Sequence, residues 1–260
     1  MKFPKILLPV LFSFIIVGCS KDSANTDGDG TPVVNKSANL KALGASANEL
    51  LSDAKFTSIN LEVVYVTGYK PSDMALNNIA QFIADRTFKP DGVRITTRAV
   101  ASSGKAPFSI EEIARIEQEE RTAYNAGDEI AVYIYVADGS NEKDEEDKVI
   151  LGSAFRNTSI VLYGKTISKL ASNYNNVDKS TVESAVLNHE FGHLFGLVDV
   201  GSPMQVNHED PSSEAHCSID LCLMNANIRF GESLIDMIGS NTVPNLDDLC
   251  INDLVANGGR

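Results

Sequence analysis

Hydrophobic residues recur along most of the chain with two different spacings, and these spacings predict strands alternating with helices. Residues 58–67 and 92–100 alternate between hydrophobic and polar positions, as expected for strands. Residues 129–137 are hydrophobic almost throughout, which is typical of a central strand buried on both faces. Residues 149–155 and 159–163 predict two further short strands.

Helical spacing appears around and between these strands. It covers residues 40–53 and residues 71–88, where a proline opens an amphipathic segment. Ser109 and Glu112 form a capping motif that begins a helix over residues 109–124. The order strand, helix, strand, helix, strand, strand, strand predicts an α+β fold with one twisted, mixed, five-stranded sheet backed by helices.

The N-terminal part of the chain has a different character. Residues 1–18 place two lysines before a hydrophobic run and predict a secretory signal peptide. The run ends in a segment that resembles a bacterial lipobox, and this resemblance implies that Cys19 becomes the lipid-bearing first residue of an exported lipoprotein, in the outer membrane or at the cell surface. Residues 19–39 are polar and predict a lipid-anchored flexible stalk, followed by one domain over residues 40–260.

Composition and charge narrow the possible partners. The chain has 260 residues and a formal net charge of −13, so it lacks the positive surface that general binding to nucleic acid requires. The only hydrophobic run that approaches membrane length is the predicted signal peptide. We expect a monomer anchored to the membrane through Cys19.

The candidate chemistry lies on a helix in the second half of the chain. This helix begins at Asp178 or Ser180, and Ser180 and Glu183 predict a second capping box. It continues to Gly196, a residue type suited to ending a helix.

This helix carries the pattern His189-Glu190-x-x-His193. Residues four apart share one face of a helix, so both imidazoles can bind one metal ion. Glu190 lies beside the open position of that ion, where a carboxylate can take a proton from water. The pattern therefore predicts a catalytic Zn²⁺ site with Glu190 as general base.

A catalytic zinc site needs a third protein ligand. Residues 189–196 resemble the metzincin metalloproteases, whose strict spacing puts this ligand at Asp199. Residues 216–224, His-Cys-x4-Cys-x-Met, are similar to the archaemetzincin segment whose histidine is the third ligand, although 19 residues, 197–215, intervene here. We favour His216, and His208 is the remaining alternative.

The same resemblance implies two further parts of the site. Met224 would form the Met-turn, a hydrophobic floor beneath the three ligands. The strand at residues 152–155 is similar to the metzincin edge strand that pairs with extended substrate.

Three cysteines follow Cys19. We expect a disulfide between Cys217 and Cys222, and a buried thiol or a competing disulfide partner at Cys250. Archaemetzincins instead use the first two cysteines with a later Cys-x-x-Cys pair for a second zinc. This chain lacks that pair, so the sequence gives little reason to expect a second metal.

Together these features predict a zinc-dependent peptidase, specifically an endopeptidase that cleaves extended proteins or peptides. The alternative is a lipid-anchored surface binding module in which a metal only holds the fold. An assay of peptide hydrolysis with and without a chelator separates the two hypotheses, because only the peptidase would cleave peptides and lose this activity on chelation.

Overall fold

The folded unit begins earlier than the sequence predicts. Asn35–Arg260 form one compact unit, whereas the predicted domain starts at residue 40. Asn39 explains the difference, because this buried side chain donates hydrogen bonds to the carbonyl oxygen of Ala131 (3.0 Å) and to Oγ1 of Thr158 (3.2 Å). The signal peptide, Cys19 and most of the predicted stalk lie outside the described residues. The computed structural model describes residues 35–146, 148–174, 177–229, 231–239 and 241–260.

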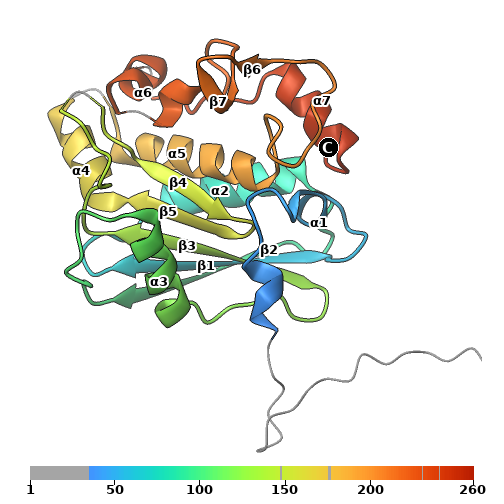
Figure 1. Ribbon diagram of the computed structural model, residues 1–260, viewed down its shortest axis with the longest axis horizontal. Coiled ribbons are helices and arrows are strands. Elements are labelled where there is room, and N and C mark those ends of the chain that lie inside the picture. Colours follow the sequence, from blue (N-terminus) through green and yellow to red (C-terminus); the bar gives the residue numbers. More distant parts are fainter. Residues whose placement is uncertain (1–34, 147, 175–176, 230, 240) are drawn as a thin grey trace, which may run out of the picture. The chain divides into compact units, whose positions relative to one another are not determined.

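A five-stranded mixed sheet forms the centre of this unit, as predicted (Figure 1). Its order is β2-β1-β3-β5-β4. The first four of these strands run parallel, and β4 runs antiparallel to β5 at the edge. The strands are β1 (Ser58–Val66), β2 (Val93–Val100), β3 (Glu129–Ala137), β4 (Gly152–Arg156) and β5 (Ser159–Tyr163).

Helices cover both faces of the sheet. Figure 1 shows α2 and α5 on one face and α3 on the other. The alternation along β3 follows this arrangement, since Ile134 packs in the cluster that contains α2 and α5, whereas Tyr133 packs in the cluster that contains α3. The helices are α1 (Ala47–Leu51), α2 (Asp73–Arg86), α3 (Ile110–Glu120), α4 (Gly164–Asn173), α5 (Lys179–Leu194), α6 (Gly231–Ile238) and α7 (Asp248–Ala256).

One of the two predicted capping motifs forms. Oγ of Ser109 accepts a hydrogen bond from the backbone N–H of Glu112 (3.1 Å) at the start of α3. The capping box predicted within α5 is wrong. The carboxylate of Glu183 pairs with Lys179 (2.8 Å) and accepts from the backbone N–H of Ser72 (2.9 Å), so a contact with the start of α2 takes the place of the local cap.

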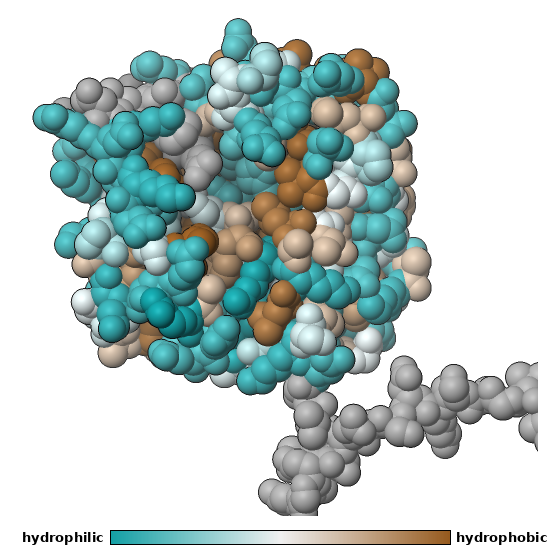
Figure 2. Space-filling view, viewed as in Figure 1, coloured by the Kyte–Doolittle hydropathy of each residue, from teal (hydrophilic) through white to brown (hydrophobic). Residues whose placement is uncertain are grey.

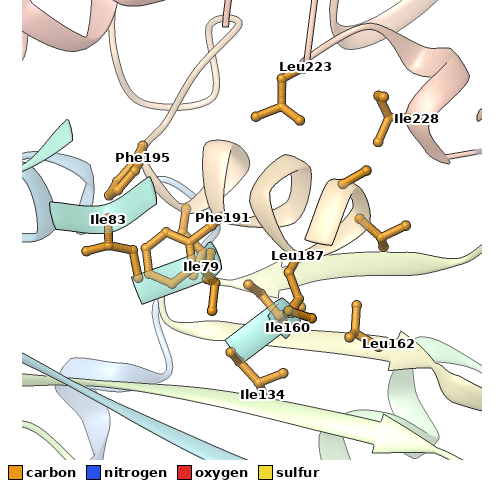
Figure 3. Packing of buried hydrophobic residues seen from close by; sticks show 14 of the residues in the cluster. Ile79, Ile83, Ile134, Ile160, Leu162, Leu187, Phe191, Phe195, Leu223 and Ile228 are labelled. Atoms are coloured by element: carbon orange, nitrogen blue, oxygen red, sulfur yellow. The ribbon is translucent and has the colours of Figure 1, made fainter. Parts of the chain in front are cut away.

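Helix α5 lies between the sheet and a C-terminal layer that the sequence did not predict in full. In Figure 3, Phe191 of α5 points toward Ile79 and Ile83 of α2, while Leu223 and Ile228 lie on the other side of α5. The layer contains α6, α7 and the short elements β6 (Glu209–Asp210), β7 (Ser213–Cys217) and η2 (Ala226–Arg229), and another short helix, η1 (Lys36–Asn39), opens the folded unit. As a result, every residue from Thr181 to Leu194 is buried.

Among the described residues, no helix is both long enough and hydrophobic enough to cross a membrane.

Candidate active site

Two histidines of α5 form the base of the site. His189 and His193 are both buried, and their Nε2 atoms lie 3.2 Å apart. Two nitrogens bound to one tetrahedral zinc ion would be about 3.3 Å apart. The helix therefore presents the two imidazoles at the spacing that a shared metal ion needs.

His216 joins them from β7. Its ring centroid lies 5.3 Å from that of His189 and 5.2 Å from that of His193. One ring nitrogen from each of the three histidines lies within 4.8 Å of the others. Asp199 is exposed and outside this group, and His208 belongs to a different cluster. Of the three alternatives, the structure brings His216 to the helix.

Hydrogen bonds to the backbone orient two of these rings. Nδ1 of His189 donates to the carbonyl oxygen of Leu223 (2.7 Å), and Nδ1 of His216 donates to the carbonyl oxygen of Glu214 (2.8 Å). A carbonyl can only accept, so each ring carries its proton on Nδ1 and keeps the lone pair on Nε2. Two buried imidazoles held in this tautomer can present Nε2 to a zinc ion together with Nε2 of His193.

Glu190 lies where α5 meets β4. It is buried, and its Oε2 accepts a hydrogen bond of 2.6 Å from the backbone N–H of Ala154. The close approach depends on Gly152, because a Cβ there would lie 2.7 Å from Cγ1 of Val186 and 3.1 Å from Oε1 of Glu190. Strand β4 thus places its backbone against the carboxylate of Glu190, which directly follows His189 in the sequence.

Met224 packs beneath the histidines. It is fully buried, and a Cβ on Gly192 would lie only 2.3 Å from its sulfur. The glycine between the two helix histidines therefore makes room for this methionine. At the end of the helix, Gly196 has φ +75°, and a Cβ there would meet the backbone N of Ser202 at 2.6 Å. The chain can turn beneath the site only with glycine at that position.

The turn before His216 has its own support. Ala215 adopts φ +63°, which is uncommon for a residue with a Cβ. Its backbone N–H donates to Oε1 of Glu209 (2.7 Å), so the short β6 element holds the residue that precedes His216. Sequence analysis did not identify Glu209, because its role depends on a hairpin with no clear alternating pattern.

His193, His216 and Glu190 open onto a cleft of about 150 Å³. Figure 2 shows a largely hydrophilic face with hydrophobic residues gathered in its hollowed middle. Leu43 and Glu214 also line the cleft, and sequence analysis missed both, since neither belongs to a motif. The lining consists of Leu43, Ser153, Ala154, Glu190, His193, Glu214, Ala215 and His216.

The cysteines differ from the prediction. Cys217, Cys222 and Cys250 are buried free thiols, so the predicted disulfide between Cys217 and Cys222 is absent from the structure. The sulfur of Cys217 lies 3.2 Å from Nδ1 of His208, and the sulfur of Cys222 lies 3.7 Å from that of Cys250. Cys217 and Cys222 were expected to pair with each other. Instead, the fold places His208 next to Cys217 and Cys250 next to Cys222.

Solved structures resemble this one over most of its length. An archaemetzincin from Methanopyrus kandleri is 16% identical, with a TM-score of 0.49 over 77% of this chain and 96% of that chain. A zinc-dependent peptidase from Methanocorpusculum labreanum is 13% identical, with a TM-score of 0.46 over 75% of this chain and 99% of that one. Metalloproteinase-II from Bacteroides fragilis is 13% identical, with a TM-score of 0.37 over 80% of this chain and 55% of that one.

Comparisons with models of protein families and with curated protein sequences found no match to this chain.

Proposed function

We propose that this protein is a zinc-dependent peptidase. The observation that carries the proposal is the meeting of three buried imidazoles, from His189, His193 and His216, beside the carboxylate of Glu190 in an open cleft. Three neutral nitrogen ligands with a fourth position facing a cleft are the arrangement of catalytic rather than structural zinc sites.

Zinc and Glu190 have different roles in the proposed hydrolysis. When bound, zinc supplies an activated water near neutral pH and polarises a carbonyl. Glu190 takes the proton of the attacking water on a carboxylate oxygen and then passes it to the nitrogen of the leaving amine. Burial of Glu190 beside the histidines keeps this proton transfer out of bulk solvent.

The edge strand β4 supports a peptide as the substrate. No other described strand pairs with its outer side, and Ser153 and Ala154 line the cleft. An extended peptide can add to such an edge through backbone hydrogen bonds. Ala154, which contacts Glu190, is the middle residue of the five-residue strand, so substrate can extend in both directions from the bond that is cut. This position supports internal cleavage, by an endopeptidase.

The variant Glu190→Gln tests the assignment of the general base. It keeps the size of the side chain and removes its ability to take a proton, so we expect hydrolysis of a fluorogenic peptide library to fall by about 10²- to 10⁴-fold. Zinc content should remain that of the unchanged protein, because Glu190 is not one of the three ligands. Unchanged hydrolysis in this variant would refute the role of Glu190.

The same library, assayed with and without a chelator, tests the function itself. Cleavage that stops on chelation and returns with zinc supports the peptidase. A correctly folded protein that holds zinc and cleaves nothing would favour the alternative, a surface binding module with a structural metal.

We also propose that Cys19 carries a lipid that anchors the enzyme at the outer membrane or cell surface. The lipobox-like segment before Cys19 and the polar stretch after it support this proposal. In cells grown with an alkyne-labelled fatty acid, the unchanged chain and Ser23→Ala should take up the label, and Cys19→Ala should not. Equal labelling of Cys19→Ala would exclude Cys19 as the acylated residue.

A further inference from the structure

A second cluster of metal-binding side chains lies behind the proposed active site. His208, Cys217, Cys222 and Cys250 come from four separate segments: the stretch before β6, the end of β7, the turn before Met224 and the first turn of α7. All four are buried, with exposed fractions between 0% and 3%. None of them belongs to the histidine site described above.

Three distances within the cluster are close to those around a tetrahedral ion. The sulfurs of Cys222 and Cys250 lie 3.7 Å apart, and Nδ1 of His208 lies 3.2 Å from the sulfur of Cys217 and 4.0 Å from that of Cys250. A zinc ion with bonds of about 2.3 Å to sulfur and about 2.05 Å to nitrogen separates its ligands by about 3.8 Å between sulfurs and about 3.5 Å between sulfur and nitrogen. A disulfide would need its sulfurs about 2.05 Å apart.

The surroundings of the cluster suit thiolate and imidazole ligands. Nε2 of His208 donates to Oδ2 of the buried Asp253 (2.8 Å), which leaves the lone pair of Nδ1 directed toward the sulfurs. Carboxylates commonly orient metal-binding histidines in this way. Backbone N–H groups of Ile219 and Met224 donate to the sulfurs of Cys217 (3.4 Å) and Cys222 (3.3 Å), and such bonds stabilise negative charge on sulfur.

Asp247 is the competing fourth ligand. One of its carboxylate oxygens lies 3.1 Å from the sulfur of Cys217, and it forms a metal-sized group with His208, Cys217 and Cys250. Its other oxygen already accepts from the backbone N–H of Cys250 (2.8 Å) and caps α7. We assign the fourth position to Cys222, because zinc in structural sites takes thiolates in preference to carboxylates and Asp247 has a role as a helix cap.

We propose that His208, Cys217, Cys222 and Cys250 bind a second, structural zinc ion. This ion ties the segment before β6 to α7. It also fixes the residue directly after His216 and the residue two before Met224, so it supports both the third histidine and the floor of the active site. The proposal does not rest on the peptidase function, because the two sites share no ligand.

Metal content of the purified full-length protein tests the proposal. We expect two zinc ions per chain, falling to one in His208→Ala, Cys222→Ser and Cys250→Ser, and also to one in the His189→Ala/His193→Ala variant, which loses the other site. Asp247→Asn is the matched control and should keep two. Loss of zinc in Asp247→Asn together with retention in Cys222→Ser would overturn the assignment of Cys222.

Cobalt substitution gives a measurement that does not depend on substitutions in the cluster. Thiolate ligands produce a charge-transfer absorption with Co²⁺ that histidine ligands do not. We expect this band in the unchanged protein and in His189→Ala/His193→Ala. Absence of the band, a single zinc ion in the unchanged chain, or a Cys222–Cys250 disulfide in its peptide mass map would each overturn the proposal.

Discussion

At the scale of single residues, the site depends on where a side chain is absent as much as on where one is present. Gly152 and Gly192 have no Cβ at the two points where β4 and Met224 come closest to α5. A side chain at Gly152 would push β4 away from Glu190 of α5, and one at Gly192 would push Met224 away from α5.

Gly192→Ala tests this dependence. Its Cβ would lie 2.3 Å from the sulfur of Met224, so we expect a loss of about 1–3 kcal/mol in the free energy of unfolding, measured in denaturant, and weaker retention of zinc. Met224→Ala removes the clashing atoms and leaves a cavity. The double variant should therefore be less destabilised than the sum of the two single variants. Strict additivity would show that Gly192 and Met224 do not share this space.

Glu214 provides a test of substrate preference that rests on the proposed peptidase function. It is exposed and lines the cleft beside His216, so we expect it to favour peptides with a basic side chain near the cut. Glu214→Gln should raise KM several-fold for lysine-containing peptides and leave neutral peptides unchanged. Glu119→Gln, an exposed carboxylate on α3, serves as the control. Equal effects on both peptide classes would contradict a charge-based preference.

At the scale of elements, β4 connects the fold to the proposed chemistry. It is an edge strand, one of its backbone N–H groups binds Glu190, and its outer side is where we propose that substrate pairs. An edge strand can lose a donor with less damage than a central strand.

The variant Ala154→Pro tests the role of β4, because proline is tolerated better in an edge strand than in a central strand. Proline removes the N–H that binds Glu190. We expect kcat/KM to fall by at least tenfold, while the melting temperature changes less than in the equivalent substitution of Val132 in the central strand β3. A fall in activity that merely follows the loss of folded protein would argue against a role for β4 in positioning Glu190.

The sequence predicted the elements whose patterns are local. Strand β3 was recognised over its full length because both faces are hydrophobic, and α3 because Ser109 caps it. The sequence did not predict α4, α6 or the hairpin of β6 and β7. Their positions are determined by packing against α5, which is buried on all sides and therefore has no distinct polar face from which its neighbours could be inferred.

The sequence likewise predicted the part of the site whose pattern is local. His189, Glu190 and His193 follow from one helical motif. The position of His216 required a choice among three candidates, because 19 residues separate it from Gly196 and sequence spacing does not determine how that segment returns. The joining of His208 with three cysteines could not be read from spacing, since its four members lie in separate segments.

At the scale of the whole molecule, the sheet and α2 hold α5 from one side, and the C-terminal layer holds it from the other. This layer carries the second cluster, and it places His216 and Met224 against α5. The proposed lipid at Cys19 would keep this unit at a membrane, where its open cleft would face extended segments of other proteins.

Anomalous X-ray diffraction at the zinc absorption edge, from crystals of the purified chain, tests the central claim most directly. We predict a zinc ion bound to Nε2 of His189, His193 and His216, with Glu190 close by but not bound to it. An ion bound by the two helix histidines and Asp199, or no ion between the histidines after zinc is added, would contradict this account.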